Sequence, residues 1–169
     1  TVETLFGEVR LLRDYYVAGD GSSCVPLDES LGLIEGYSPG LAKMMALIAA
    51  QDSFEEGSKD LLAYAGVKVG PKAIARMTKL VAPQMRAAHA AAKPEQTMAA
   101  IPLLYFRAQG LFIDFGVVEA GCKTVVGKRL KNSGMFWSVK DAQNVLDLRT
   151  FLLSNRFDRL WLARDQKAA

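Results

Sequence analysis

The chain has 169 residues, 50% of them hydrophobic, so it can bury the core of about one compact domain and is not a disordered chain. No apolar run approaches the roughly 18 residues of a membrane span, so we expect no membrane partner. Two isolated cysteines and one histidine argue against a disulfide scaffold, a four-cysteine zinc site and a histidine-based triad.

Residues 1–37 are predicted to form a small β and loop region. The short β-prone runs Thr1–Phe6 and Val9–Val17 indicate a hairpin or two edge strands. Residues 18–40 are rich in glycine, proline and serine, which predicts a loop. The loop ends at Ser38-Pro39, a helix N-cap followed by proline at the first helical position, so a helix should begin there.

Residues 38–92 are predicted to contain a helix-turn-helix. The pattern Ser53-Phe-Glu-Glu56 is typical of a capping box and predicts a helix to about Ala65, which Gly66 ends with a positive φ. Residues 67–70 form a short turn, and Pro71 opens another helix through about Val81. The alanine-rich stretch 82–92 extends it despite an internal proline. Helix, tight turn and helix is the layout of a helix-turn-helix.

Residues 93–104 contain two prolines and are predicted to form a linker, and residues 105–169 form a C-terminal helical region. Leu111–Ile113 is a candidate strand, and a helix is expected over 116–131, broken at 132–134. Ser138-x-x-Asp141 caps a further helix, and a last short helix covers 156–163. The predicted fold is therefore mainly α with a small N-terminal β hairpin.

Charge is distributed unevenly along the chain. Residues 1–60 carry 11 acidic and 4 basic residues, whereas residues 61–169 carry 17 basic and 7 acidic residues. Such asymmetry suggests an anionic partner for the second part, with nucleic acid the usual candidate. A solvated basic surface is the alternative.

The helix that begins at Pro71 divides into an apolar and a basic face. With Ile74 at zero on a helical wheel, Lys79, Lys72 and Arg76 fall at about 140°, 160° and 200°, opposite the apolar arc. A recognition helix needs this division, because its cations meet phosphates or guanine edges. An ordinary amphipathic helix shows the same division.

The helix over 116–131 carries a carboxylate within its apolar arc. Glu119 falls between Val126 and Leu130 on the wheel, where a carboxylate is costly unless it pairs or binds a cation. It either lies at the rim and pairs with Lys123, four residues later, or serves as a metal-binding carboxylate. The rest of this helix is basic and supplies the candidate DNA-binding residues Lys123, Lys128, Arg129 and Lys131.

Several segments resemble bacterial insertion-sequence transposases of the ISKra type, a DDE-type group. The most specific are Phe106-Arg-Ala-Gln-Gly-Leu-Phe-Ile113, Gly116–Val126 and Arg129-Leu-Lys-Asn-Ser-Gly-Met-Phe-Trp137. N-terminal segments such as Pro26-Leu-Asp-Glu29 and the turn at Ala65–Val69 are also similar. The resemblance covers nearly the whole chain outside roughly residues 84–104.

The resemblance implies an internally deleted transposase. In the family, an RNase H-like domain that supplies two catalytic aspartates lies where this chain has only its short linker, so that core is largely missing. Glu119 matches the family's final catalytic acid, and its metal-binding partners have no matching positions. The family implies Mg²⁺, but two-metal chemistry needs several carboxylates. Cys24 stands alone where family members often carry paired cysteines, so residues 1–37 are a degenerate zinc-knuckle-like region and no zinc is expected.

The function that the resemblance implies is binding of double-stranded DNA at insertion-sequence ends in the bacterial cytoplasm, by a protein that is catalytically inactive alone. A second copy of the chain or an intact transposase is the expected protein partner. Two alternatives stay open: a non-functional helical remnant, and a transposase subunit active only with carboxylates from another chain. The residues assigned to DNA are Lys72, Arg76, Lys79, Lys123, Lys128, Arg129 and Lys131.

Overall fold

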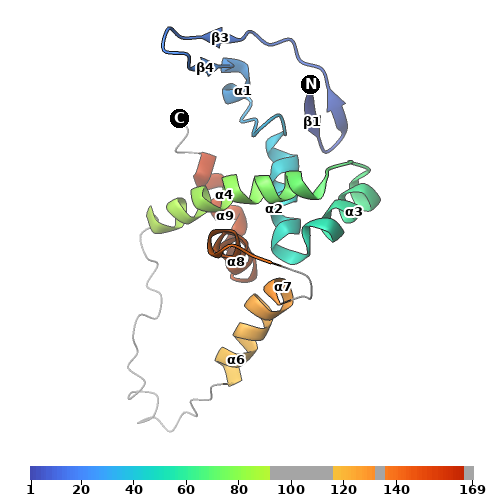
Figure 1. Cartoon of the computed structure of the whole chain (residues 1–169), viewed down its shortest axis with the longest axis vertical. Coiled ribbons are helices and arrows are strands. Elements are labelled where there is room, and N and C mark those ends of the chain that lie inside the picture. The colour runs from blue at the N-terminus through green and yellow to red at the C-terminus, as the bar shows by residue number, and fades with distance from the viewer. Residues whose placement is uncertain (92–115, 132–135, 166–169) are drawn as a thin grey trace.

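Figure 1 shows the computed structural model, which describes residues 1–91, 116–131 and 136–165. In these residues the chain is mainly helical with a small antiparallel hairpin at its N-terminus, and this confirms the predicted fold class. The predicted linker over 93–104, the candidate strand at 111–113 and the break at 132–134 lie outside the described residues.

The N-terminal hairpin is shorter than predicted. Strand β1 (Val2–Thr4) pairs antiparallel with β2 (Gly7–Val9), and Gly7 has a φ of +105°, which favours glycine. Backbone hydrogen bonds of Glu3 to residues 36 and 38 join the hairpin to the start of the helical body. Strand β3 (Tyr16–Val17) does not extend β2 but pairs with β4 (Ser23–Cys24).

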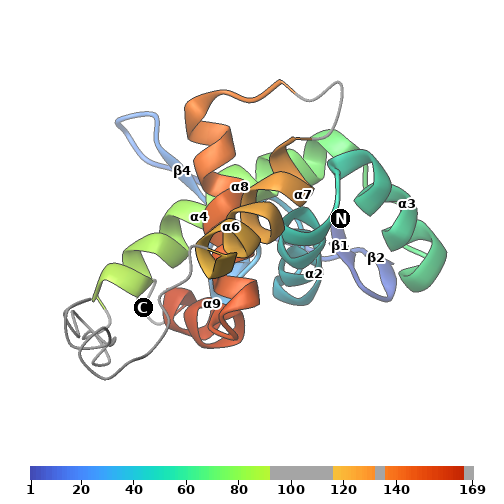
Figure 2. The same ribbon diagram turned by 90° about the horizontal axis from the view of Figure 1, so that it is seen from below.

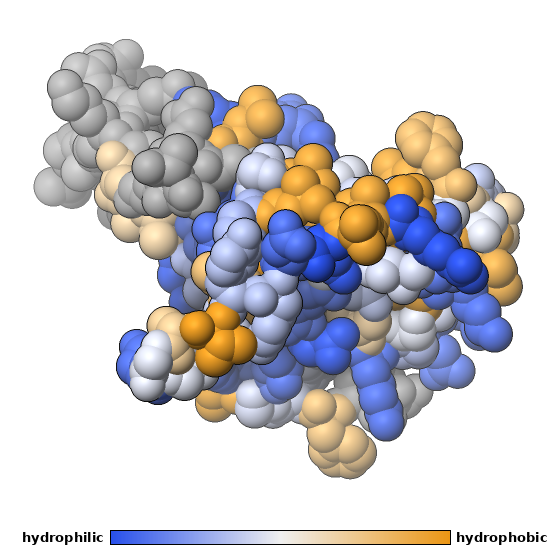
Figure 3. All heavy atoms as spheres, turned by 90° about the horizontal axis from the view of Figure 1, so that it is seen from above, coloured by the Kyte–Doolittle hydropathy of each residue, from blue (hydrophilic) through white to orange (hydrophobic). Residues whose placement is uncertain are grey.

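The prediction that residues 18–40 form only a loop is wrong. This segment holds β4 and the short helix α1 (Pro26–Ser30), which begins with proline at its first turn and carries two acidic residues there. Asp28 of α1 accepts two hydrogen bonds from Arg13, at 2.6 and 2.7 Å. Figure 3 looks down on this side of the molecule and shows hydrophobic side chains interspersed with hydrophilic ones.

The predicted helix caps are confirmed. Ser38 precedes α2 (Pro39–Gln51), and its hydroxyl oxygen accepts from the backbone N–H of Leu41 at 3.4 Å. Ser53 precedes α3 (Phe54–Ala65) and accepts from the N–H of Glu56 at 3.1 Å. Gly66 ends α3 with a φ of +67°. Helix α4 (Pro71–Ala91) continues through its internal proline, as the alanine-rich sequence predicts.

Helices from both halves of the chain share one core. Helices α2, α4 and α8 (Val139–Leu153) pack against one another, and α9 (Phe157–Asp165) packs on α4 and α8. Figures 1 and 2 show α8 and α9 lying against α4. The C-terminal helices α8 and α9 therefore cover their apolar faces on α2 and α4. The buried residues include Leu41, Met45, Ile74, Met77, Val81, Met85, Leu148, Phe157, Leu160 and Trp161.

The helix predicted over 116–131 is present but changes its winding. It consists of α6 (Gly116–Cys122), a π-helical turn η1 (Lys123–Gly127) and α7 (Lys128–Leu130). A π turn adds residues to one turn and rotates the faces of the next turns, and such turns often lie at functional sites. This arm extends from the body on the side opposite the N-terminal strands (Figure 1). Among the described helices, none combines the length and the apolar character that crossing a bilayer requires.

Candidate nucleic-acid interface

The turn between α3 and α4 alternates between buried and exposed residues. Val67 and Val69 are 4% and 3% exposed, and Lys68 between them is exposed. The hydroxyl of Ser58 on α3 donates to the carbonyl of Val69, which holds the turn on the helix before it. Alternation of this kind aims one residue into the core and the next at solvent. Lys68 therefore joins Lys72 at the exposed beginning of α4.

The three cations predicted on the basic face of α4 are all exposed, and two of them are ion-paired. Arg76 pairs with Glu35 from the loop before α2, and Lys79 Nζ lies 3.1 Å from Asp141 Oδ1 on α8. Lys72 makes no ion pair with any described residue. The predicted face exists, but acidic side chains from distant parts of the sequence neutralise two of its three charges.

The ion pair at Asp141 lowers the pKa of that carboxyl below its ordinary value of 3.8. Hydrogen bonds from Lys79 and then from the Ser138 hydroxyl are the largest causes, because both favour the ionised form. Ser138 in turn accepts the N–H of Asp141 at 3.1 Å, so this residue also belongs to the predicted cap of α8.

We expect Asp141→Asn to destabilise the protein at neutral pH and not in acid. A folded-state pKa below the unfolded one contributes stability above pH 3.8 and loses it as the pH falls through the folded value. The pair is solvent-screened, so the difference at pH 7 should be no more than about 0.5 kcal/mol. Thermal melts of both proteins at pH 7 and pH 2.5 measure it. Asp14→Asn, at an exposed site, is the control, and a difference that persists at pH 2.5 would contradict the expectation.

Arg129 was assigned to DNA, and that assignment is wrong, because its side chain is 0% exposed. Its Nε donates to the carbonyl of Ala49 at 2.9 Å, and its guanidinium lies 4.9 Å from the ring centre of Phe54 and 5.0 Å from that of Trp137. Burial and the positive charge of Arg149 lower its pKa to about 10. On the wheel that has Glu119 at zero, Arg129 falls at about 280°, inside the apolar arc. This position on the wheel was the signal in the sequence that Arg129 would be buried.

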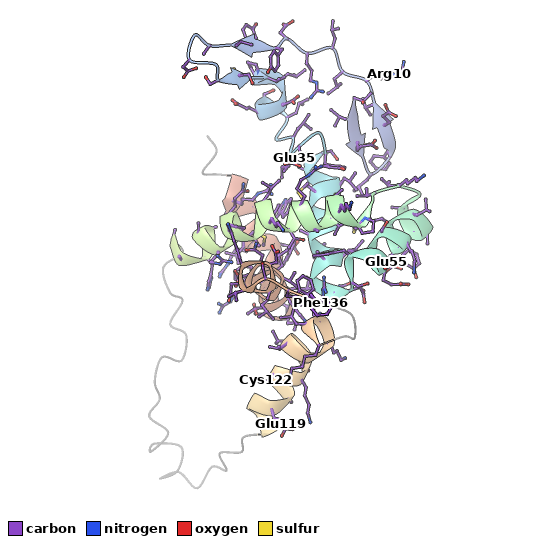
Figure 4. The ribbon with its side chains drawn as sticks, viewed as in Figure 1. Arg10, Glu35, Glu55, Glu119, Cys122 and Phe136 are labelled. Atoms are coloured by element: carbon purple, nitrogen blue, oxygen red, sulfur yellow. The ribbon has the colours of Figure 1, made fainter. Side chains whose placement is uncertain are left out.

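Glu119 is exposed, and its Oε1 lies 2.7 Å from Lys123 Nζ. Of the two alternatives predicted for this residue, the structure therefore fits the ion pair with Lys123. Figure 4 places it near the free end of α6, away from the helical body. In the part of the chain that the structure describes, no three histidine, cysteine or acidic side chains form a group that could hold a metal ion. One lysine-paired carboxylate does not fit the several carboxylates that two-metal chemistry needs, and we assign no step to Mg²⁺.

The remaining cations of the predicted interface lie on the arm and not beside α4. Lys123, Lys128 and Lys131 are exposed on η1, on α7 and just after it. Helix α8 packs against both α4 and η1 and so lies between the two groups of cations. The predicted set therefore divides into an α4 face and an arm. Cys122 is exposed on this arm, and Cys24 is exposed on β4.

Arg149 on α8 was missed by the sequence analysis, although it connects three elements. Its Nη1 donates to the carbonyl of Ala50 at 2.6 Å and to that of Gln51 at 3.3 Å, at the end of α2. Its Nε and Nη2 donate to the carbonyl of Thr124 in η1, at 3.0 and 2.8 Å. The last carbonyls of a helix lack partners within it and carry partial negative charge, which a guanidinium satisfies. The signal in the sequence was the spacing of Arg149 from Val145. Residues four apart lie on the same face of a helix, and Val145 is buried.

Comparison of the chain with models of protein families, with curated proteins and with solved structures identified no match.

Proposed function

We propose that this protein binds double-stranded DNA through α3, the turn after it and α4, as an internally deleted derivative of an insertion-sequence transposase. The DNA-binding part of the proposal rests on one observation: α3, a turn that begins at a left-handed glycine and α4 form a helix-turn-helix layout, and α4 keeps a basic face exposed while its other face is buried. The proposed membership of the transposase family rests on the resemblance in sequence. It also supports the ends of the parent element as the DNA site, and the bacterial cytoplasm as the location.

The beginning of α4 is the part best suited to enter a DNA groove. Lys68 and Lys72 are exposed there and make no ion pair with any described residue, and Tyr64 at the end of α3 is 87% exposed. Recognition helices contact base edges with their N-terminal residues, and the elements beside them contact the backbone. Two uncompensated cations and a phenol hydroxyl suit phosphate contacts at this position.

The paired cations further along α4 are available to DNA at small cost. Arg76 and Lys79 are 57% and 56% exposed, and exposed ion pairs contribute only about 0–1 kcal/mol. A phosphate can therefore replace either carboxylate. The arm with Lys123, Lys128 and Lys131 supplies a second basic surface, for the same duplex or for one held by a second copy or an intact transposase. We assign no strand cleavage to the chain alone, because two-metal chemistry needs several carboxylates and the resemblance supplies only Glu119.

Fluorescence anisotropy of a labelled duplex from the parent element's end, against a scrambled duplex, tests the proposal over a range of salt concentrations. We expect the triple variant Lys72→Ala, Arg76→Ala, Lys79→Ala to bind at least tenfold more weakly. We also expect it to lower the slope of log affinity against log salt by about 2.7, because each of the three lost phosphate contacts removes about 0.9. Glu35→Gln should strengthen binding, since it leaves Arg76 without its competing carboxylate.

Lys43→Ala is the matched control, because Lys43 pairs with Asp158 away from the α4 face. It should leave both affinity and salt slope nearly unchanged. Unchanged affinity in the triple variant, together with equal binding of both duplexes, would refute the assignment of α4 and leave a charged helical remnant as the better description.

A further inference from the structure

The turn just before α2 directs an acidic side chain at the basic face of α4. Ile34 and Tyr37 exchange two backbone hydrogen bonds of 3.0 Å, so Glu35 and Gly36 form a two-residue loop between them. The carboxylate of Glu35 pairs with Arg76 on α4, and the Glu35 side chain stays 39% exposed. Figure 4 places Glu35 beside α4, where the N-terminal part of the chain meets the helical body.

Glu35 has a backbone conformation that its residue type disfavours. Its φ is +49° and that of Gly36 is +83°, so both central residues of the loop are left-handed. Two-residue hairpin loops of this kind favour asparagine or aspartate followed by glycine, because these residues tolerate a positive φ. Gly36 follows this rule and Glu35 does not. Residues held in disfavoured conformations often lie at functional positions, and the ion pair with Arg76 indicates the basic face of α4 as that position.

The turn is held in place independently of the ion pair. The backbone N–H of Glu3 on β1 donates to the carbonyl of Gly36 at 2.8 Å, and the N–H of Ser38 donates to the carbonyl of Glu3 at 2.9 Å. Ser38 is also the N-cap of α2, so the loop is fixed between β1 and α2. The fold therefore positions the carboxylate of Glu35 at Arg76, and a phosphate that approaches this guanidinium must displace it.

The N-terminal region, residues 1–37, is acidic and contributes little to the core. It carries seven acidic and two basic residues, a balance of −5, which repels the phosphates of DNA. None of residues 3–40 is buried, and Leu12, Tyr15 and Val17 are each more than half exposed. Segments with few buried contacts open at a low cost in free energy. The region can therefore move away from α4 with little effect on the packing of the helices.

We propose that the N-terminal region is an acidic cover of the DNA-binding face, in which Glu35 occupies the place on Arg76 that a phosphate takes in the complex. The two groups compete because a carboxylate and a phosphate both bind the forked donors of a guanidinium. Binding of DNA displaces Glu35 and loosens the region that carries it. The inference rests on the proposed function, because it assigns an autoinhibitory contact to the same face of α4.

Fluorescence anisotropy with the labelled duplex from the element's end tests the role of the charge. We expect Glu35→Gln to bind about threefold tighter than the parent chain, because Arg76 then lacks its competing carboxylate. In the Arg76→Ala background, the same substitution should gain no more than the control Glu29→Gln. The control makes the same change in the same region, at an exposed position that makes no ion pair with any described residue.

Glu35→Asn distinguishes the charge from the conformation of the turn. Asparagine suits the left-handed conformation, so this variant should melt about 2–4 °C above Glu35→Gln. Both variants should gain the same affinity for the duplex, since both remove the carboxylate. A gain in only one of them would show that the turn and not the charge affects binding, and would overturn the proposal. Glu35→Asn also replaces Glu35→Gln should the latter fail to melt cooperatively.

Hydrogen exchange followed by mass spectrometry tests the displacement directly. When the duplex is added, the amides of Glu3, Ile34 and Tyr37 should exchange faster, because their hydrogen bonds hold the turn in place. Amides at the beginning of α4 should exchange more slowly, since the duplex covers them. Unchanged or slower exchange at the turn in the DNA complex overturns the proposal.

The outcomes distinguish the acidic cover from the proposed function. Equal binding of the duplex by the parent chain and by Glu35→Gln leaves DNA binding standing and overturns the acidic cover. A gain of the same size in the Arg76→Ala background shows a general effect of charge and also overturns it. Absence of binding by both the parent chain and Glu35→Gln refutes the proposed function, and with it the regulation of that face.

Discussion

Replacing Arg149 with alanine should lower the free energy of unfolding by about 4 kcal/mol, because it removes charge-assisted hydrogen bonds worth roughly 1.5–3 kcal/mol each and leaves the buried carbonyl of Ala50 unsatisfied. Arg149 is 6% exposed and donates to the last carbonyls of α2 on one side and to Thr124 of η1 on the other. Water cannot replace the guanidinium fully at the buried carbonyl of Ala50. Chemical denaturation followed by circular dichroism measures the loss.

Two further variants distinguish the effect of the forked guanidinium geometry from the effect of its positive charge. Arg149→Lys keeps the positive charge but has one nitrogen, which cannot reach both α2 and η1, so it should recover less than half of the loss. Lys140→Ala, at an exposed position of the same helix, should change stability by less than about 0.5 kcal/mol. A lysine variant as stable as the parent would show that charge alone, and not the forked geometry, stabilises the end of α2.

Replacing Gly57 with alanine should destabilise the protein by about 2 kcal/mol, although alanine is the better helix former by about 1 kcal/mol. Gly57 is buried in α3, and a Cβ there would overlap Cγ2 of Ile48 on α2. Ile48 is β-branched and packed against the core, so it cannot turn away without strain. Thermal and denaturant unfolding of the variant measure the net cost.

Gly121→Ala is the matched control for Gly57→Ala. Gly121 also lies within a helix, and a Cβ there would meet no atom within 4 Å. The same substitution should therefore stabilise the protein by about 0.5–1 kcal/mol, through helix propensity alone. Stabilisation in both variants would show that α3 moves away from α2 at little cost, and that their close approach is not required by the fold.

Local sequence patterns predicted the helices well, because the interactions that start and stop a helix lie within a few residues. Ser38, Ser53 and Ser138 all cap the helices that they were predicted to cap, and Gly66 ends α3 in the left-handed conformation. The basic face of α4 was likewise predicted from spacing, and Lys72, Arg76 and Lys79 are exposed on it. Short strands and α1 were less well predicted, since two-residue pairings leave almost no periodicity to detect.

Partners from distant parts of the chain explain why the site could not be predicted in full. Glu35 and Asp141 neutralise cations of α4 from positions 41 and 62 residues away in sequence, which no wheel of one helix can show. Arg129 looked like a surface cation in a basic helix, but Phe54, Trp137 and the end of α2 enclose it. A pocket of about 170 Å³, lined by Thr78 of α4 and Asn144 of α8 among others, likewise exists only because the two helices pack together.

The sequence by itself determined the helical class, the helix caps, the turn between α3 and α4 and the excess of positive charge after residue 60, because each depends on neighbouring residues or on composition. Only the tertiary structure decided that α8 and α9 pack on α4, which cations stay exposed, and that two buried arginines bind the end of α2. The physical reason is that burial, ion pairing and hydrogen bonding of helix-end carbonyls depend on contacts between segments tens of residues apart. The periodicity of a single helix does not identify those contacts.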